Sequence, residues 1–106
     1  MVRFNRLMAV DGEADITLTL KIVLEQKSFL VDVFNDPETA LIKFKPHFYD
    51  LLLIDVNMPH LNGFELYQEI KTKDRYAKEE SCCFIRKPID IDYLVNKIMK
   101  ALIEFK

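Results

Sequence analysis

Continuous apolar runs alternate along the chain with stretches in which apolar residues recur at helical spacing. The run from Leu51 to Ile54, closed by Asp55, is typical of a central strand that is buried on both faces. Similar runs complete a set of predicted strands at Arg6–Val10, Phe29–Phe34, Leu51–Asp55 and Cys82–Arg86. Asp32 interrupts the second run, which favours an edge position for that strand.

Helical periodicity fills the intervals between the predicted strands. The predicted helices cover Ala14–Gln26, residues 37–44, residues 64–73 and residues 91–105. Each of the last three begins at a capping signal, namely Asp36-Pro37, Asn62 with Glu65, and Asp90. In the third helix we expect Phe64, Tyr67 and Ile70 to face the core. The charged segment 74–80 fits either a helix extension or a loop.

This alternation predicts an α/β fold with a parallel sheet and right-handed crossovers. The first and third strands lie side by side, with the second strand outside the first. Asp11 follows the first strand, Asp55 closes the third, and Lys87 follows the last. The charged ends of all three meet at the carboxyl edge, where open α/β sheets bind ligands. A single carboxylate there would be interpreted as a turn or cap, but three charged strand ends indicate a functional crevice.

Composition narrows the class of protein. The chain has 106 residues, half of them hydrophobic, so we expect a single domain over residues 1–106 with no output domain. A formal charge of −2 argues against a general nucleic-acid or membrane binder. The sequence contains neither a signal peptide nor a run long enough to span a bilayer, so we expect a cytoplasmic protein. Cys82 and Cys83 lack metal-ligand spacing and are expected to be small buried residues.

Three motifs together resemble the receiver domain of two-component response regulators. They are Val-Asp-x-Glu at 10–13, Asp-x-x-Met-Pro-x-x-Asn-Gly at 55–63, and Phe-Ile-Arg-Lys-Pro at 84–88. Their order and strand context match the family over nearly the whole chain. The resemblance implies a flavodoxin-like three-layer sandwich.

The resemblance also implies a role for each charged residue. Asp55 would accept a phosphoryl group from the phosphohistidine of a sensor histidine kinase. Asp11, Asp55 and the backbone carbonyl of Asn57 would hold Mg²⁺, Lys87 would pair with the phosphoryl oxygens, and Lys87-Pro88 would be a cis peptide. Phosphoryl transfer needs positioning and charge neutralisation, which these residues supply, so we expect no catalytic residue and no enzyme activity. A downstream protein would read the result, without direct nucleic-acid binding or membrane insertion.

The chain departs from the family at two places. The second acid that normally follows the first strand is replaced by Gly12, and we expect the neighbouring Glu13 not to reach the metal, so Mg²⁺ affinity should be weak. The eight residues 74–81 are too few for the strand and helix that the family places before its last strand, since an average pair needs roughly 17 residues. We therefore expect four strands in the order 2-1-3-last, with no switch Thr or Ser. Phe84 occupies the family's aromatic switch position and is expected mainly to pack in the core.

Three functions follow as alternatives. The first is a phosphoacceptor receiver. The second is a degenerate receiver that acts as a binding or dimerisation module without phosphorylation, which Gly12 and the missing switch favour. The third, an unrelated small enzyme or nucleotide-binding fold, is disfavoured because two glycines cannot form a Gly-rich phosphate loop. His60 follows Asp55 closely but is expected to be a solvated loop residue.

Overall fold

A computed structural model describes residues 5–74 and 81–104 of the chain. Its helices and strands follow the order β1 (Arg6–Val10), α1 (Ala14–Gln26), β2 (Leu30–Phe34), α2 (Pro37–Lys43), β3 (Leu51–Asp55), α3 (Gly63–Lys73), β4 (Cys82–Ile85) and α4 (Ile91–Glu104). The predicted alternation of strands and helices is confirmed. Of the segment that the sequence left open, residues 75–80 lie outside the described part.

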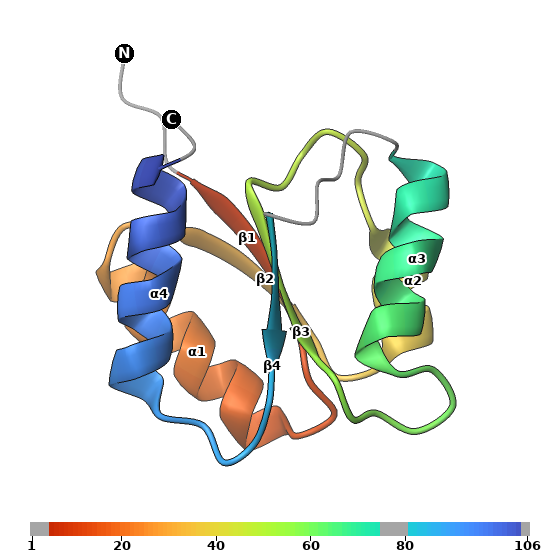
Figure 1. Cartoon of the computed structure of the whole chain (residues 1–106), viewed down its shortest axis with the longest axis horizontal. Coiled ribbons are helices and arrows are strands. Elements are labelled where there is room, and N and C mark those ends of the chain that lie inside the picture. Colours follow the sequence, from red (N-terminus) through yellow and green to blue (C-terminus); the bar gives the residue numbers. More distant parts are fainter. Residues whose placement is uncertain (1–4, 75–80, 105–106) are drawn as a thin grey trace.

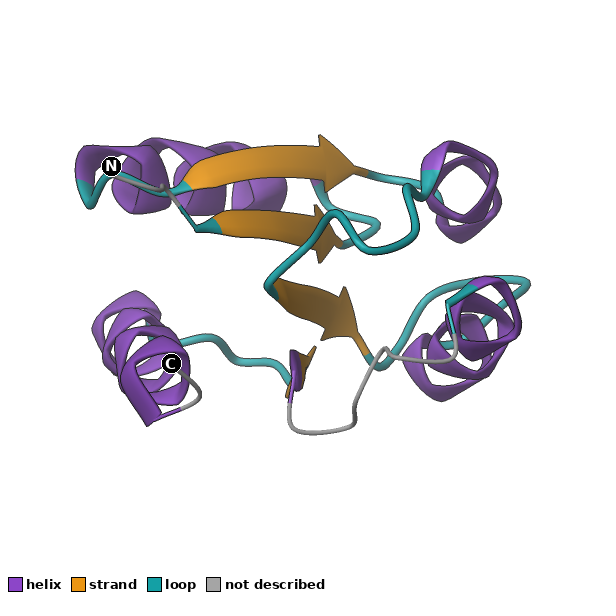
Figure 2. Cartoon of the chain, turned by 90° about the horizontal axis from the view of Figure 1, so that it is seen from above, coloured by secondary structure: helices purple, strands orange, loops and turns teal. Residues whose placement is uncertain are grey.

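The strands form a parallel sheet in the order β2-β1-β3-β4, as predicted. Helices α1 and α4 cover one face, and α2 and α3 cover the other, which makes the expected three-layer sandwich (Figures 1 and 2). Because β4 pairs directly with β3, the chain closes without the additional strand that the resemblance implied. Within the described ranges, every helix falls short of what crossing a membrane would require.

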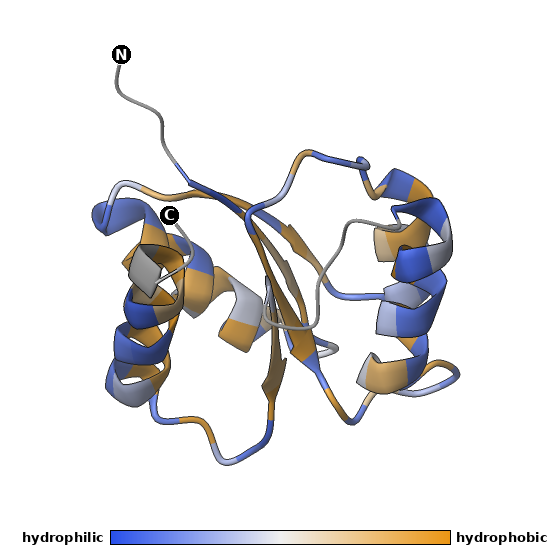
Figure 3. Cartoon of the chain, turned by 45° about the horizontal axis from the view of Figure 1, so that its top comes forward, coloured by the Kyte–Doolittle hydropathy of each residue, from blue (hydrophilic) through white to orange (hydrophobic). Residues whose placement is uncertain are grey.

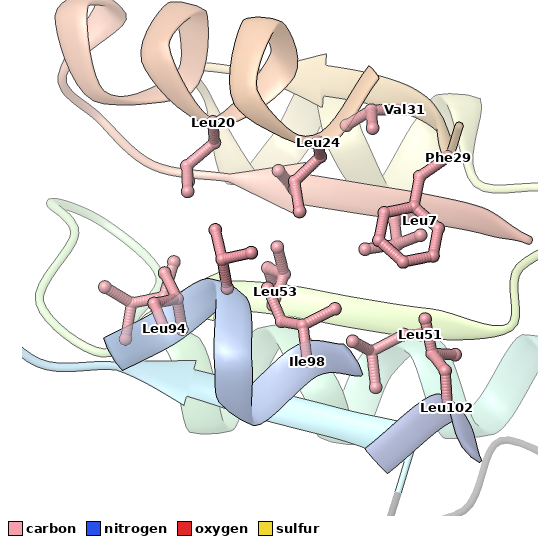
Figure 4. Packing of buried hydrophobic residues seen from close by; sticks show 13 residues of the cluster. Leu7, Leu20, Leu24, Phe29, Val31, Leu51, Leu53, Leu94, Ile98 and Leu102 are labelled. Atoms are coloured by element: carbon pink, nitrogen blue, oxygen red, sulfur yellow. The ribbon is translucent and has the colours of Figure 1, made fainter. Parts of the chain in front are cut away.

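Apolar residues of the sheet point alternately into two cores, one under each helical layer. The strands are largely coloured hydrophobic in Figure 3, between the two layers of helices. On the α1 and α4 side, Leu7 and Leu53 pack against Leu20, Leu24 and Ile98, and each of the five is at most 1% exposed (Figure 4). Burying one such side chain stabilises the fold by roughly 2 kcal/mol. Together these contacts fix β1 and β3 as the rigid centre from which the loops at the carboxyl edge extend.

Four boundaries and one face differ from the prediction. Helix α2 ends at Lys43 and α3 begins at Gly63, each one residue early. Phe29 precedes β2, because Ser28 adopts a positive φ of 69° and the Phe29 amide bonds back to Leu24 at 3.2 Å. The last strand ends at Ile85, one residue early.

The third helix places its apolar stripe differently from the prediction. Phe64 is 43% exposed, whereas Leu66 is fully buried beside Tyr67 and Ile70. The prediction that Phe64 faces inward was therefore wrong. Phe64 lies in the first turn, and its ring packs instead on the half-buried Phe84, with 4.6 Å between ring centroids.

The two cysteines are only half-buried. Cys82 packs with the core under α3, and Cys83 with the core under α4, which is the expected opposition of neighbouring strand residues. Their predicted role as buried apolar residues is thus only partly met, because β4 is an edge strand of the described sheet.

Candidate functional site

Asp11, Asp55 and Lys87 meet at the carboxyl edge of the sheet. The Lys87 ammonium lies 3.0 Å from Asp11 Oδ1 and 3.5 Å from Asp55 Oδ2. It also lies 3.1 Å from Glu13 Oε2. The predicted convergence of the three strand ends is confirmed, and Glu13 joins it through Lys87.

Both aspartates are almost completely buried, with Asp11 0% and Asp55 2% exposed. Burial raises the pKa of Asp11, against the hydrogen bonds from the Glu13 amide and Lys87, and the nearby Asp55 charge raises it further. Burial alone would lower the pKa of Lys87, but hydrogen bonds to Asp11 and Glu13 outweigh it and raise that pKa above its ordinary value. Lys87 is therefore a permanent cation that compensates two buried acids.

Each of the two aspartates forms a local turn of the same kind with its own loop. Asp11 Oδ1 accepts a hydrogen bond of 2.9 Å from the Glu13 amide, and Asp55 Oδ1 accepts one of 3.1 Å from the Asn57 amide. Such side-chain turns are typical of Asp directly after a strand. They fix the orientation of each carboxylate through its Oδ1.

The second oxygens have different surroundings. Asp55 Oδ2 faces Lys87, whereas Asp11 Oδ2 is buried and has no hydrogen-bond partner among the described residues. A buried carboxylate oxygen without a partner is costly, and a bound cation would satisfy it.

The site can be tested for its fit to Mg²⁺, the cofactor that the resemblance implied. Mg²⁺ binds through one or two carboxylates and keeps several waters. Asp11, with its unpartnered oxygen, Asp55 and the backbone carbonyl of Asn57 supply oxygen donors of this kind. In the described residues, the acids do not form a cluster of three or more metal-ligating side chains. The donor set therefore fits a hydrated Mg²⁺ with few protein ligands.

Two glycines in the loops differ in the space around them. A Cβ at Gly12 would have nothing within 4 Å, so a side chain there would meet open space. A Cβ at Gly63 would lie 2.5 Å from the backbone oxygen of Asp55, which only glycine permits. The Gly63 amide also bonds to the Val56 carbonyl at 3.0 Å. The start of α3 is therefore fastened to the backbone of Asp55.

Asn35 and Thr17 support the site and were missed from the sequence. Asn35 Nδ2 donates to the backbone oxygen of Asp11 at 2.9 Å and to Thr17 Oγ1 at 2.8 Å. Thr17 is 2% exposed. The position of Asn35, directly after β2 at the same edge of the sheet, was the signal that could have identified it.

The chain's resemblance to known proteins agrees with this geometry. Residues 7–79 match the model of the response regulator receiver domain. The chain belongs to this family. The matched range ends before β4, so the lysine of this receiver lies beyond it, and it is the β3–β4 pairing that brings Lys87 to the acids.

Curated and solved relatives show the same family. The receiver is 26% identical to the response regulator ArlR of Staphylococcus aureus over 115 residues, covering 92% of this chain and 52% of ArlR. The chain thus spans about half the length of the curated relatives it matches.

Among solved structures, the receiver domain of the hybrid histidine kinase CckA is 26% identical, with a TM-score of 0.80 and coverage of 92% of this chain and 99% of that one. The response regulator TrrA of Thermotoga maritima, solved with Mg²⁺ and BeF, is also 26% identical, with a TM-score of 0.71 over 92% and 99% of the two chains. TrrA in complex with the histidine kinase ThkA gives 29% identity and a TM-score of 0.73, over 93% and 99%.

Three further predictions concern residues near the crevice. Phe84 packs its ring near Phe64 and Tyr67, in agreement with the core-packing role expected for it. His60 is exposed, as expected of a loop residue. The Lys87-Pro88 peptide is cis, which confirms that expectation.

Proposed function

We propose that this receiver accepts a phosphoryl group on Asp55 from the phosphohistidine of a sensor histidine kinase. The observation that carries this proposal is the Lys87 ammonium, held 3.5 Å from Asp55 Oδ2 with buried Asp11 beside it. An oxygen of the Asp55 carboxylate attacks phosphorus, and the bond between phosphorus and the histidine nitrogen breaks as the new P–O bond forms. The electron pair of the broken bond leaves with the imidazole.

The surrounding residues position and neutralise the reacting groups. The Asn57 amide orients the Asp55 carboxylate, and Lys87 offsets the negative charge that the phosphoryl oxygens bring. Mg²⁺, held by Asp11, Asp55 and the Asn57 carbonyl, would supply further neutralisation of those oxygens. With one acid fewer at Gly12, we propose that this Mg²⁺ site is weak.

The kinase is proposed to approach over the start of α1. Leu18 and Ile22 lie one turn apart on α1 and are 58% and 50% exposed. They follow Glu13 by five and nine residues, about 1.4 and 2.5 turns, on the helix that begins at the crevice. TrrA in complex with a histidine kinase supports a kinase as the class of partner. The downstream partner is proposed to be a protein that responds to the phosphorylated receiver.

One observation favours the second candidate, a receiver that binds partners without phosphorylation. Lys87 is already paired with three carboxylates, including the exposed Glu13. An incoming phosphoryl group would have to compete with Asp11 and Glu13 for this lysine. The two candidates differ in whether Asp55 becomes modified.

The test is intact-mass measurement after incubation with a small-molecule phosphodonor and Mg²⁺. The wild-type protein should gain one phosphoryl group, and Asp55→Asn should gain none. Asp92→Asn, a change of an exposed carboxylate on α4, is the matched control and should gain the group as the wild type does. Absence of a gain with every donor would support the phosphorylation-independent module. Turnover of a separate substrate that survives Asp55→Asn would instead indicate an enzyme.

A further inference from the structure

The two outer strands of the sheet differ in how their edges are protected. At β2, the Lys21 ammonium donates to the Val31 carbonyl at 2.9 Å, and Asp32 in mid-strand accepts from the Tyr49 hydroxyl at 2.7 Å. Charged groups at an edge strand discourage another strand from pairing there. The β2 edge is therefore guarded.

The β4 edge carries no such protection. Its sequence, Cys82 to Ile85, has no charged residue, and in the described part of the chain it pairs with β3 alone. The Ile85 carbonyl accepts from the Val56 amide, on the β3 side. Because backbone groups alternate in direction along a strand, the amide and carbonyl of Phe84 point away from β3. Among the described residues, nothing pairs with these two groups, so they can pair with an added strand.

Two cavities lie along this edge, between β4 and α4. Their volumes are about 330 and 300 Å³, and Cys83, Phe84, Arg86 and Lys97 line both of them. The larger cavity has no carboxylate among its lining residues.

The two cations at the edge have no acidic partner in the described residues. Lys97 extends from α4, and the Arg86 guanidinium lies over the Phe64 ring at 5.7 Å on the α3 side. The described residues of the edge thus have uncharged side chains within β4 and a cation on each flank.

We infer that the outer edge of β4 binds an extended segment of another protein, rich in apolar residues and carboxylates, which adds to the sheet as a fifth strand. Backbone hydrogen bonds to Phe84 would provide the pairing, and Arg86 and Lys97 would select the carboxylates. A second copy of this chain fits less well, because its own β4 has no carboxylate and would bring two further cations to the same edge. The inference does not depend on modification of Asp55.

The experiment uses the full chain and a fluorescent, end-blocked peptide of alternating valine and glutamate, with binding followed by anisotropy. Two further peptides serve as comparisons: one has lysine in place of glutamate, and one is N-methylated at alternate backbone amides. We expect the glutamate peptide to bind, and the other two to bind at least about tenfold more weakly, since they lose the charge pairing or the backbone pairing.

Protein variants locate the binding. Arg86→Glu with Lys97→Glu should weaken binding of the glutamate peptide by roughly tenfold or more, and Arg86→Ala with Lys97→Ala, a milder change, by several-fold. The matched control, Lys43→Glu with Lys45→Glu beside β2, should stay within about twofold of the wild type. Thermal melting by circular dichroism checks that each variant is folded.

Three results would overturn the inference. They are no binding of the glutamate peptide, equal binding of the lysine or N-methylated peptide, and equal loss of binding in the β2 control. Dimerisation of the wild-type chain in sedimentation, abolished by Phe84→Pro and unaccompanied by peptide binding, would assign the edge to a second copy instead.

Discussion

The loop after β1 and the loop after β3 both begin with a buried aspartate whose Oδ1 accepts from the amide two residues on. From there they diverge. The first loop is short and passes through the unobstructed Gly12 to Glu13, which is the N-cap position of α1 but makes no side-chain cap bond. The second loop runs to Asn62, which caps α3 in a full capping box.

This difference separates two tasks. The β3 loop fixes the proposed acceptor, because the cap and the close approach of Gly63 leave its backbone little freedom. The β1 loop has two features that a ligand could use. Asp11 Oδ2 has no hydrogen-bond partner among the described residues, and the space around Gly12 is open. Its capping carboxylate, Glu13, is directed to Lys87 instead of the helix. The loop after β3, which carries the proposed acceptor, is therefore the constrained one. The loop after β1 is the one with room and an unpartnered oxygen for a proposed Mg²⁺.

Replacing each glycine by alanine should give the largest difference in stability between the two loops. Gly63→Ala should lower the free energy of unfolding by about 2 kcal/mol, because the new Cβ would overlap the Asp55 carbonyl. Gly12→Ala should be neutral or stabilise by up to about 1 kcal/mol, since it meets no neighbour and restricts the unfolded chain. Urea denaturation followed by circular dichroism measures both. Equal effects would show that the two loops are equally constrained.

An acidic side chain at position 12 tests whether the β1 loop can contribute a further ligand to Mg²⁺. Gly12→Asp should tighten Mg²⁺ binding by roughly tenfold, because the added anionic ligand increases the charge around the metal. Isothermal titration calorimetry measures the affinity, and Gly12→Asn is the control of similar shape without charge. Tight binding by the wild type, or no gain from the aspartate, would contradict the weak site that we propose.

The unpartnered oxygen of Asp11 should make stability depend on pH. Burial raises the folded-state pKa of Asp11 above its ordinary value of 3.8, so the folded protein holds this proton more tightly than the unfolded chain does. Stability from the protonated form is complete below 3.8 and is lost as pH rises through the folded pKa.

Asp11→Asn removes this loss and should stabilise the metal-free protein by about 1 kcal/mol at pH 7. The gain should shrink as the pH falls through the raised pKa of Asp11, because the wild-type carboxyl then becomes protonated. Urea unfolding at a series of pH values provides the measurement. A gain that is constant with pH would attribute the effect to packing.

Removing the side chains at the N-cap positions of α3 and α1 should give the smallest difference in stability between the two loops. Asn62→Ala removes the hydrogen bond to the Glu65 amide and should cost roughly 0.5–1 kcal/mol of stability. Glu13→Ala, at the equivalent position of α1, removes no cap bond and should change helix stability by less than about 0.5 kcal/mol. Thermal melts of the two variants compare them. A larger loss for Glu13→Ala would mean that its pair with Lys87 stabilises the fold strongly.

Features that depend on local sequence were predictable. The bounds of β1, α1 and β3 agree with the prediction because long apolar patterns and clear breaks define them. The crossover rules then placed Asp11 beside Asp55, and the short connection before Cys82 predicted that β4 pairs with β3.

Features that depend on side-chain direction were not predictable. The inward Leu66 was missed because the first turn of a capped helix shifts its stripe relative to Phe64. Glu13 was expected to miss the metal, which stays a prediction, but its reach to Lys87 depends on a rotamer that no pattern specifies. The clamp of Asn35 on the Asp11 carbonyl likewise requires the packing of β2 against β1.

The direct pairing of β3 with β4 bears on how small such a module can become. Three adjacent strands, β1, β3 and β4, supply every charged group of the crevice, and β2 contributes only the buttress from Asn35. Because β4 pairs with β3 in parallel register, Lys87 emerges at the same edge of the sheet as Asp11 and Asp55. A miniaturised scaffold that carries two buried acids and a lysine at one edge of a four-stranded sheet could therefore begin from this arrangement.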